Sequence, residues 1–155
     1  PPAHIPDIVF TNINYGKVEL WGLDGSVFVF LDRNFSTNIS FSYLGKTSFY
    51  NFLTRENDPI NAPEYKINAT LTYMPDMGIN WNIGMRYIPD FDWSAGVHYG
   101  TIQSYTVFDG ALGYNFNPTY GILLNINNLN NDVHNEIIGG PKLGRHVTLK
   151  LTARF

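Results

Sequence analysis

The stretch His146-Val-Thr-Leu-Lys-Leu-Thr-Ala-Arg-Phe155 alternates polar and apolar side chains without a break. Successive side chains of a β-strand point to opposite faces, so odd-numbered residues share one face and even-numbered residues the other. The odd positions are apolar, and the even positions are polar or cationic. The pattern predicts a strand between two different environments, at a length suited to a tilted strand that crosses a membrane.

The same alternation recurs along the chain and never changes phase within a segment. Five further segments show it: 35–43, 65–73, 79–87, 108–116 and 120–126, with Leu123 as an exception on the polar face. Together with an opening strand over 17–31, we count about seven strands. The sequence therefore predicts an all-β, antiparallel up-and-down sheet.

The opening strand departs from this rule between residues 27 and 31. Trp21, Val27 and neighbouring odd positions form its apolar face, but Phe28 and Phe30 lie on the polar face with Asp24. We interpret these two rings as contacts to a domain that fills the interior of a barrel. A ligand-contacting aromatic pair is the alternative.

Connections of two lengths separate the strands. Short turns are expected at 31–34, 74–78 and 117–119, where Pro, Gly, Asn and Asp supply hairpin chemistry. Longer polar connections are expected at 1–16, about 53–64, about 89–103 and about 130–143. Strict alternation of short and long connections places all short turns at one end of the sheet, as in outer-membrane barrels.

Composition excludes several classes of protein. The chain has 155 residues, of which 44% are hydrophobic and 15% charged, so it is not a disordered polymer. Without about twenty consecutive apolar residues there is no membrane-spanning helix, and the mean hydropathy of −0.15 suits a barrel whose apolar residues alternate with polar ones. A net charge of −3 argues against nucleic acid as a partner, and the absence of cysteine excludes disulfides and thiolate sites.

Alternation alone does not say which face points outward. A soluble lipocalin-like barrel would place its apolar residues inside. However, many apolar faces here begin or end in an aromatic residue, as at Tyr65 and Tyr73, and this is typical of the girdles at membrane interfaces. The polar faces are rich in Ser, Thr, Asn and Gly, which favours a packed or watery lumen.

Several segments, in this order, make the chain resemble the carboxy-terminal part of a TonB-dependent outer-membrane receptor, from the superfamily of siderophore and SusC-like receptors. They are 14–24, Asn61-Ala-Pro-Glu-Tyr-Lys66, Tyr105-Thr-Val-Phe-Asp109 with Leu112-Gly-Tyr114, Ile126-Asn-Asn-Leu129, and Gly144-Arg145 leading to Arg154-Phe155. The resemblance implies a share of a 22-stranded transmembrane barrel closed around an amino-terminal plug. The whole of 1–155 is then barrel wall, and the plug and the first strands lie outside this chain.

The resemblance also implies function, location and partners. It implies active uptake of a scarce nutrient, such as a siderophore, vitamin, glycan or peptide, across the outer membrane of a Gram-negative cell, without catalysis and without a cofactor. The implied partners are lipid and lipopolysaccharide, the remaining strands and plug in the same or another chain, the TonB complex, the barrel-assembly machinery and a surface lipoprotein. Nucleic acid is not among them. A passive channel or small structural barrel and a soluble lipocalin-like barrel are the alternatives.

Two sets of residues follow as candidates for these contacts. Residues expected to face the lumen or plug are Asp24, Phe28, Phe30, Lys66, Arg86, Asp109, Lys150 and Arg154. Residues expected to form a barrel-assembly signal are Leu149, Leu151, Ala153 and Phe155. The four histidines, His4, His98, His134 and His146, lack ligand spacing and are interpreted as polar loop or lumen groups, although His98 and His134 are placed where a metal-chelate or haem substrate would pass. No catalytic or metal-binding residue is expected.

Overall fold

The computed structural model describes residues 17–154 and consists of eleven strands with the bounds that follow. They are β1 (Gly22–Phe30), β2 (Phe35–Leu44), β3 (Ser48–Asn51), β4 (Glu56–Pro59), β5 (Tyr65–Tyr73), β6 (Gly78–Ile88), β7 (Phe91–Ala95), β8 (His98–Ile102), β9 (Tyr105–Asn115), β10 (Tyr120–Asn127) and β11 (His146–Ala153). No helix within residues 17–154 is long and apolar enough to cross a membrane.

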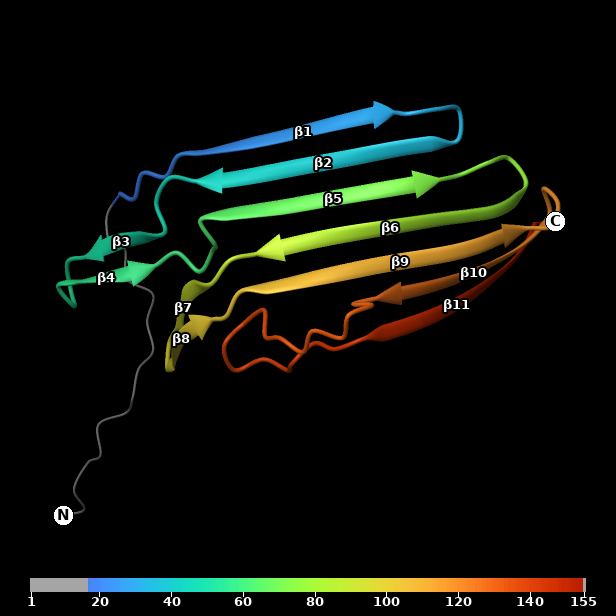
Figure 1. Cartoon of the computed structure of the whole chain (residues 1–155). Coiled ribbons are helices and arrows are strands. Elements are labelled where there is room, and N and C mark those ends of the chain that lie inside the picture. Colours follow the sequence, from blue (N-terminus) through green and yellow to red (C-terminus); the bar gives the residue numbers. More distant parts are fainter. Residues whose placement is uncertain (1–16, 155) are drawn as a thin grey trace, which may run out of the picture.

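Seven of these strands form one antiparallel sheet in the order β1-β2-β5-β6-β9-β10-β11 (Figure 1). The seven-stranded count and the up-and-down order are therefore confirmed. Turns at 31–34, 74–77 and 116–119 meet at one end of the sheet, and the connections 45–64, 89–104 and 128–145 meet at the other. We call these the turn end and the loop end.

The turns have the chemistry that the sequence indicates. The Asn117 side chain accepts hydrogen bonds from the backbone N–H groups of Thr119 and Tyr120, at 2.9 and 2.8 Å. Gly78, at the end of the second turn, has a φ of +87°, a conformation that costs glycine nothing because it has no Cβ. Short turns with these residues fix the register of each hairpin.

Three expected boundaries are wrong. The opening strand begins at Gly22 rather than 17, because its partner β2 ends at Leu44, opposite Gly22. The strand expected at 108–116 already begins at Tyr105, and the connection expected at about 53–64 spans residues 45–64. The long connections also contain two hairpins, β3–β4 and β7–β8, that the alternation did not predict. The expected connection at 1–16 and the predicted residues His4 and Phe155 lie outside the described residues.

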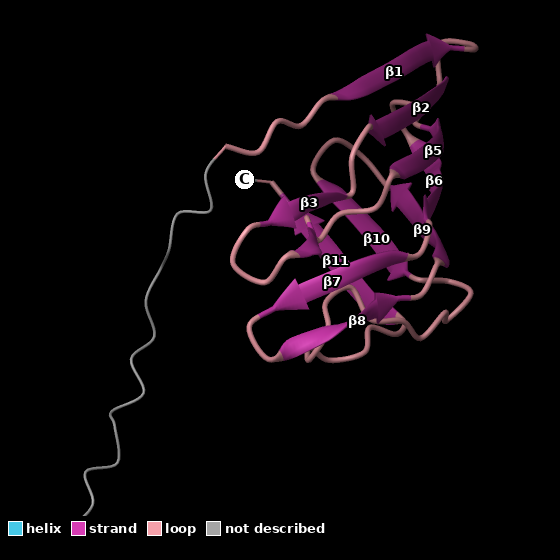
Figure 2. Cartoon of the chain, turned by 90° about the vertical axis from the view of Figure 1, so that its left-hand side faces the viewer, coloured by secondary structure: helices cyan, strands magenta, loops and turns pink. Residues whose placement is uncertain are grey.

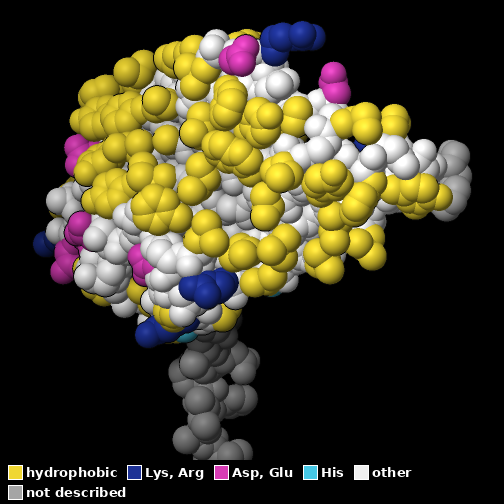
Figure 3. Space-filling view, turned by 45° about the vertical axis from the view of Figure 1, so that its right-hand side comes forward, with side chains coloured by type: hydrophobic (Ala, Val, Ile, Leu, Met, Phe, Trp, Pro, Cys, Tyr) yellow, Lys and Arg dark blue, Asp and Glu magenta, His cyan; other side chains and the backbone are white. Residues whose placement is uncertain are grey.

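The sheet is curved, and its two faces differ. The loop-end hairpins lie on the concave side (Figure 2). The convex side is covered with apolar side chains (Figure 3), which are exposed over most of its strands. They include Leu23, Val27, Ile39, Ile79, Ile83, Leu112, Tyr114, Val147, Leu149 and Leu151. The inside–outside arrangement of a lipocalin-like barrel, with apolar residues on the concave side, is therefore wrong for this sheet.

A small hydrophobic core lies at the loop end of the concave side. Ile88, Ile102, Tyr105 and Val107 are buried, and Phe91, Trp93 and Ile138 pack against them. The β7–β8 hairpin and the 128–145 connection supply part of this cluster, so they fold over the ends of β6 and β9. This packing places a wall of loops beside the polar part of the concave face.

Candidate functional site

The strand register gathers the predicted lumen residues on the concave face. Arg86 pairs with Asn68, and Lys66 pairs with Ser42, which in turn pairs with Asp24. Phe28 lies opposite Asn38, and its ring contacts that of Phe30 edge to face at 4.9 Å between centroids. Both residues remain more than half exposed, on the concave face, which is polar along most of this strand pair.

A pocket at the loop end contains two of the predicted residues, Lys66 and Arg86. Its cavity volume is about 320 Å³. Strands β5, β6, β7 and β9 and the connections at 61–63 and 128–145 form its wall. The lining residues are Asn61, Ala62, Pro63, Lys66, Asn68, Arg86, Ile88, Phe91, Trp93, Tyr105 and Glu136. The pocket thus combines an aromatic wall with two cations and one carboxylate.

The charges in this pocket are only loosely paired. Arg86 Nη2 lies 3.9 Å from Glu136 Oε1, which is long for an ion pair, and Arg86 Nε is buried without a hydrogen-bond partner. His134 Nε2 lies 3.7 Å from the same Glu136 oxygen. A buried N–H group without an acceptor is uncommon, because it loses its hydrogen bond to water and gains none in return.

His134 is held in place by its ring and its other nitrogen. The ring stacks on Tyr105 with centroids 3.9 Å apart, and Nδ1 lies 2.8 Å from the Asp132 carbonyl oxygen. Because that carbonyl only accepts, Nδ1 carries the ring proton. His134 is therefore a buried residue of the 128–145 connection, which packs on Tyr105 and has the Glu136 carboxylate as a neighbour. Across residues 17–154, His, Asp and Glu side chains form no group of three that would hold a metal ion.

Besides its packing on the core, the β7–β8 hairpin is joined to the 60–63 segment by the Asn61 side chain. Asn61 Nδ2 donates to the Ser94 carbonyl oxygen at 2.8 Å, and the Ser94 N–H donates to Asn61 Oδ1 at 2.7 Å. The amide imitates a backbone pairing and joins the 60–63 segment to β7. Asn61 has a φ of 60°, which asparagine tolerates better than most residues.

We expect Asn61→Gly to loosen the β7–β8 hairpin while keeping the backbone conformation. Loss of two hydrogen bonds, at about 1 kcal/mol each, should speed amide exchange in 91–102 by roughly tenfold or more. Hydrogen–deuterium exchange of the full-length receptor measures this. Asn57→Ala, on the exposed side of β4, is the control. Equal exchange in both variants would show that the Asn61 amide does not anchor the hairpin.

A second anchored turn lies beside the pocket at 128–132. Asp109 accepts a hydrogen bond from the Asn128 N–H at 2.8 Å, and the buried Asn128 amide bonds both the N–H and the carbonyl of Asp132. Arg145 Nη2 donates to the Leu129 carbonyl oxygen at 2.6 Å. The predicted lumen residue Asp109 therefore organises a loop turn.

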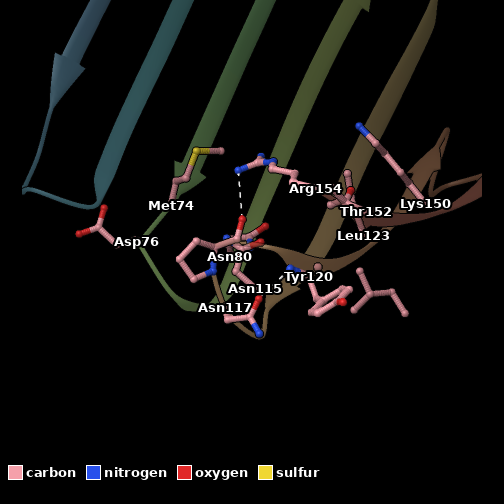
Figure 4. A pocket seen from close by; sticks show the side chains of 13 residues that line it. Met74, Asp76, Asn80, Asn115, Asn117, Tyr120, Leu123, Lys150, Thr152 and Arg154 are labelled. Atoms are coloured by element: carbon pink, nitrogen blue, oxygen red, sulfur yellow. Dashed lines mark hydrogen bonds between the residues drawn. The ribbon is translucent and has the colours of Figure 1, made fainter.

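The predicted residues Lys150 and Arg154 lie at the turn end, in a second concave-face pocket of about 230 Å³ (Figure 4). Arg154 Nη1 donates to the Pro118 carbonyl oxygen at 3.4 Å, and its backbone N–H donates to Thr119 at 3.0 Å. Asn80, Asn115 and Thr152 surround the two cations, and Leu123, the exception on the polar face, also lines this pocket. The arrangement offers cationic donors at the rim of the concave face.

Sequence reasoning missed the aromatic wall and Glu136. Tyr105 and Val107 were the available signal, because they put apolar side chains on the otherwise polar face of β9. That reversal indicates that something packs on the concave face there.

An apolar convex face, a polar concave face and connections that are short at one end and long at the other define the wall of an outer-membrane type of β-barrel. A family model described as TonB dependent receptor-like, beta-barrel, matches residues 2–129. The chain belongs to this family, which consists of transporters of the Gram-negative outer membrane and not of enzymes. A search of curated proteins finds no match.

Solved structures show the same fold. The ferric enterobactin receptor PfeA of Pseudomonas aeruginosa, as its G324V mutant, has a TM-score of 0.66 and 16% identity over 86% of this chain and 22% of that chain. The siderophore receptor PiuA of Acinetobacter baumannii has a TM-score of 0.65 and 16% identity, over 86% of this chain and 21% of that one. The chain thus spans about a fifth of these receptors' length.

Proposed function

We propose that this chain forms the carboxy-terminal strands of a TonB-dependent receptor that actively takes up a scarce nutrient across the outer membrane. The observation that carries the proposal is the two-faced sheet in a chain of this barrel family. Its convex face suits lipid, and its concave face suits a water-filled or plugged lumen. The loop-end pocket then faces the outside of the cell and the turn-end pocket the periplasm.

The barrel needs more strands than this sheet provides. Within residues 17–154, β1 and β11 each pair on one side only. Lipid does not tolerate an open sheet edge, because its N–H and C=O groups find no partner there. Further strands, in the same or another chain, close the barrel in this proposal, and a plug occupies its lumen.

The plug is proposed to rest on the turn end of the concave face. Exposed Phe28 and Phe30 offer it an apolar contact, and Lys150 and Arg154 offer hydrogen bonds to acidic or carbonyl groups. The odd residues Leu149, Leu151, Ala153 and Phe155 are proposed as the signal for barrel assembly. Leu149 and Leu151 are exposed on the convex side.

Uptake that depends on TonB tests the proposal. A cell that carries the full-length receptor as its one uptake route is supplied in turn with labelled iron chelates, cobalamin, glycans and peptides. We expect uptake of one class, and its loss when TonB is deleted or the membrane potential is collapsed. Uptake that survives both treatments would identify a passive channel instead.

A further inference from the structure

We propose that the loop-end pocket binds a carboxylate carried on a flat ring, as part of the nutrient that the receptor imports. This inference rests on the proposed function, because that function makes the ligand an imported nutrient. The chemical class of the ligand follows from the residues that line the pocket.

Two cationic side chains lie close together in the pocket lining. Lys66 of β5 and Arg86 of β6 lie diagonally on neighbouring strands, because Asn68 pairs with Arg86 and Lys66 is two residues from Asn68 on the same face. Glu136 is the one carboxylate in the lining, and its oxygen is 3.9 Å from Arg86. The lining therefore carries a net positive charge.

The Arg86 guanidinium is also incompletely hydrogen-bonded. Arg86 Nε is buried and lacks a hydrogen-bond partner. Nε–H and the neighbouring Nη–H form the planar fork that binds both oxygens of a carboxylate. The Arg86 side chain as a whole is 43% exposed, so a small turn of the guanidinium would present this edge to an incoming carboxylate and satisfy the Nε–H group.

The remaining wall suits a ring. Phe91, Trp93 and Tyr105 line the same cavity. Its volume of about 320 Å³ lies at the lower end of the range for ligand pockets and exceeds the roughly 150 Å³ of cavities that bind benzene. Asn68, whose Nδ2 donates to Ser40 Oγ, also lines the cavity and offers its amide oxygen as an acceptor for a ring substituent.

Benzoate and its neutral isostere benzamide test this chemistry on the purified full-length receptor. Ligand-observed NMR titration gives the dissociation constant of each. We expect benzoate to bind and benzamide to bind at least about tenfold more weakly, since a hydrogen bond to a charged group is worth about 1.5–3 kcal/mol. Absence of benzoate binding, or equal binding of the two probes, would overturn the proposal.

Two substitutions of opposite effect make the test specific. Arg86→Gln should weaken benzoate about tenfold, whereas Glu136→Gln should tighten it by about threefold, because a repelling carboxylate is removed. Lys142→Gln is the control: it removes an exposed cation from the 128–145 connection, which also carries Glu136, and should leave binding unchanged. Weaker binding in both pocket variants would mean that the two residues serve only to hold the loops.

Binding in detergent needs neither TonB nor a membrane potential. Failure of benzoate to bind would refute the site and leave the proposed uptake standing. If benzoate binds but uptake does not depend on TonB, the site stands and the proposed uptake is refuted.

Discussion

Leu149→Arg is expected to destabilise the barrel by about 2–4 kcal/mol when it is folded into a bilayer. Leu149 lies in the middle of β11, pairs with Leu124 and is 61% exposed on the convex face. If that face meets lipid, an arginine there places a charge near the centre of the bilayer. Ile83→Arg, in the middle of β6, should have a similar cost.

The matched control is Thr148→Arg, one residue away on the concave face. Arginine there points to the lumen, so the free energy of unfolding should change by less than about 1 kcal/mol. Urea-dependent folding of the full-length receptor into liposomes measures both variants. If Thr148→Arg and Leu149→Arg lowered the free energy of unfolding equally, the convex face would not be the one that contacts lipid.

Asn128→Ala is expected to release the turn at 128–132, at a local cost of about 2–4 kcal/mol. The buried amide would no longer bond the Asp132 N–H and carbonyl, at 2.9 and 2.8 Å. Alanine would also have to adopt the φ of 61° that Asn128 shows, which costs about 1–2 kcal/mol. Faster amide exchange at 128–134 is the expected result.

Two comparison variants separate these causes. Asn128→Gly removes the hydrogen bonds but accepts the positive φ, so its exchange should lie between that of the wild type and that of Asn128→Ala. Asn127→Ala alters an exposed neighbour and should have little effect. If alanine at 127 and at 128 gave the same exchange, the Asn128 side chain would not hold the turn.

The large sheet was predictable because its two faces contact different environments. In β6, Ile79, Trp81 and Ile83 share the convex side, and Asn80 and Asn82 the concave side. That contrast persists through strands of eight to eleven residues, so the strand periodicity is clear. Turn residues such as Asn117 and Gly78 then fix the hairpins.

The hairpins and the pocket were not predictable in the same way. β3, β4, β7 and β8 have only four or five residues each, too few for alternation to stand out. The hydrogen bonds between Asn61 and Ser94 join residues 33 positions apart, and no pattern in the sequence predicts them. Glu136 enters the pocket through a connection without regular structure, so only the fold brings it to Arg86.

Spin-label accessibility along β11 tests the central claim of a lipid-facing convex side most directly. The chain contains no cysteine, so single cysteines from 147 to 152 carry a label without competition from this region. In the full-length receptor in liposomes, labels at 147, 149 and 151 should be accessible to oxygen from lipid, and labels at 148, 150 and 152 to a water-soluble nickel chelate. Oxygen accessibility at 148, 150 and 152 instead, or accessibility that does not alternate between odd and even positions, would contradict the claim.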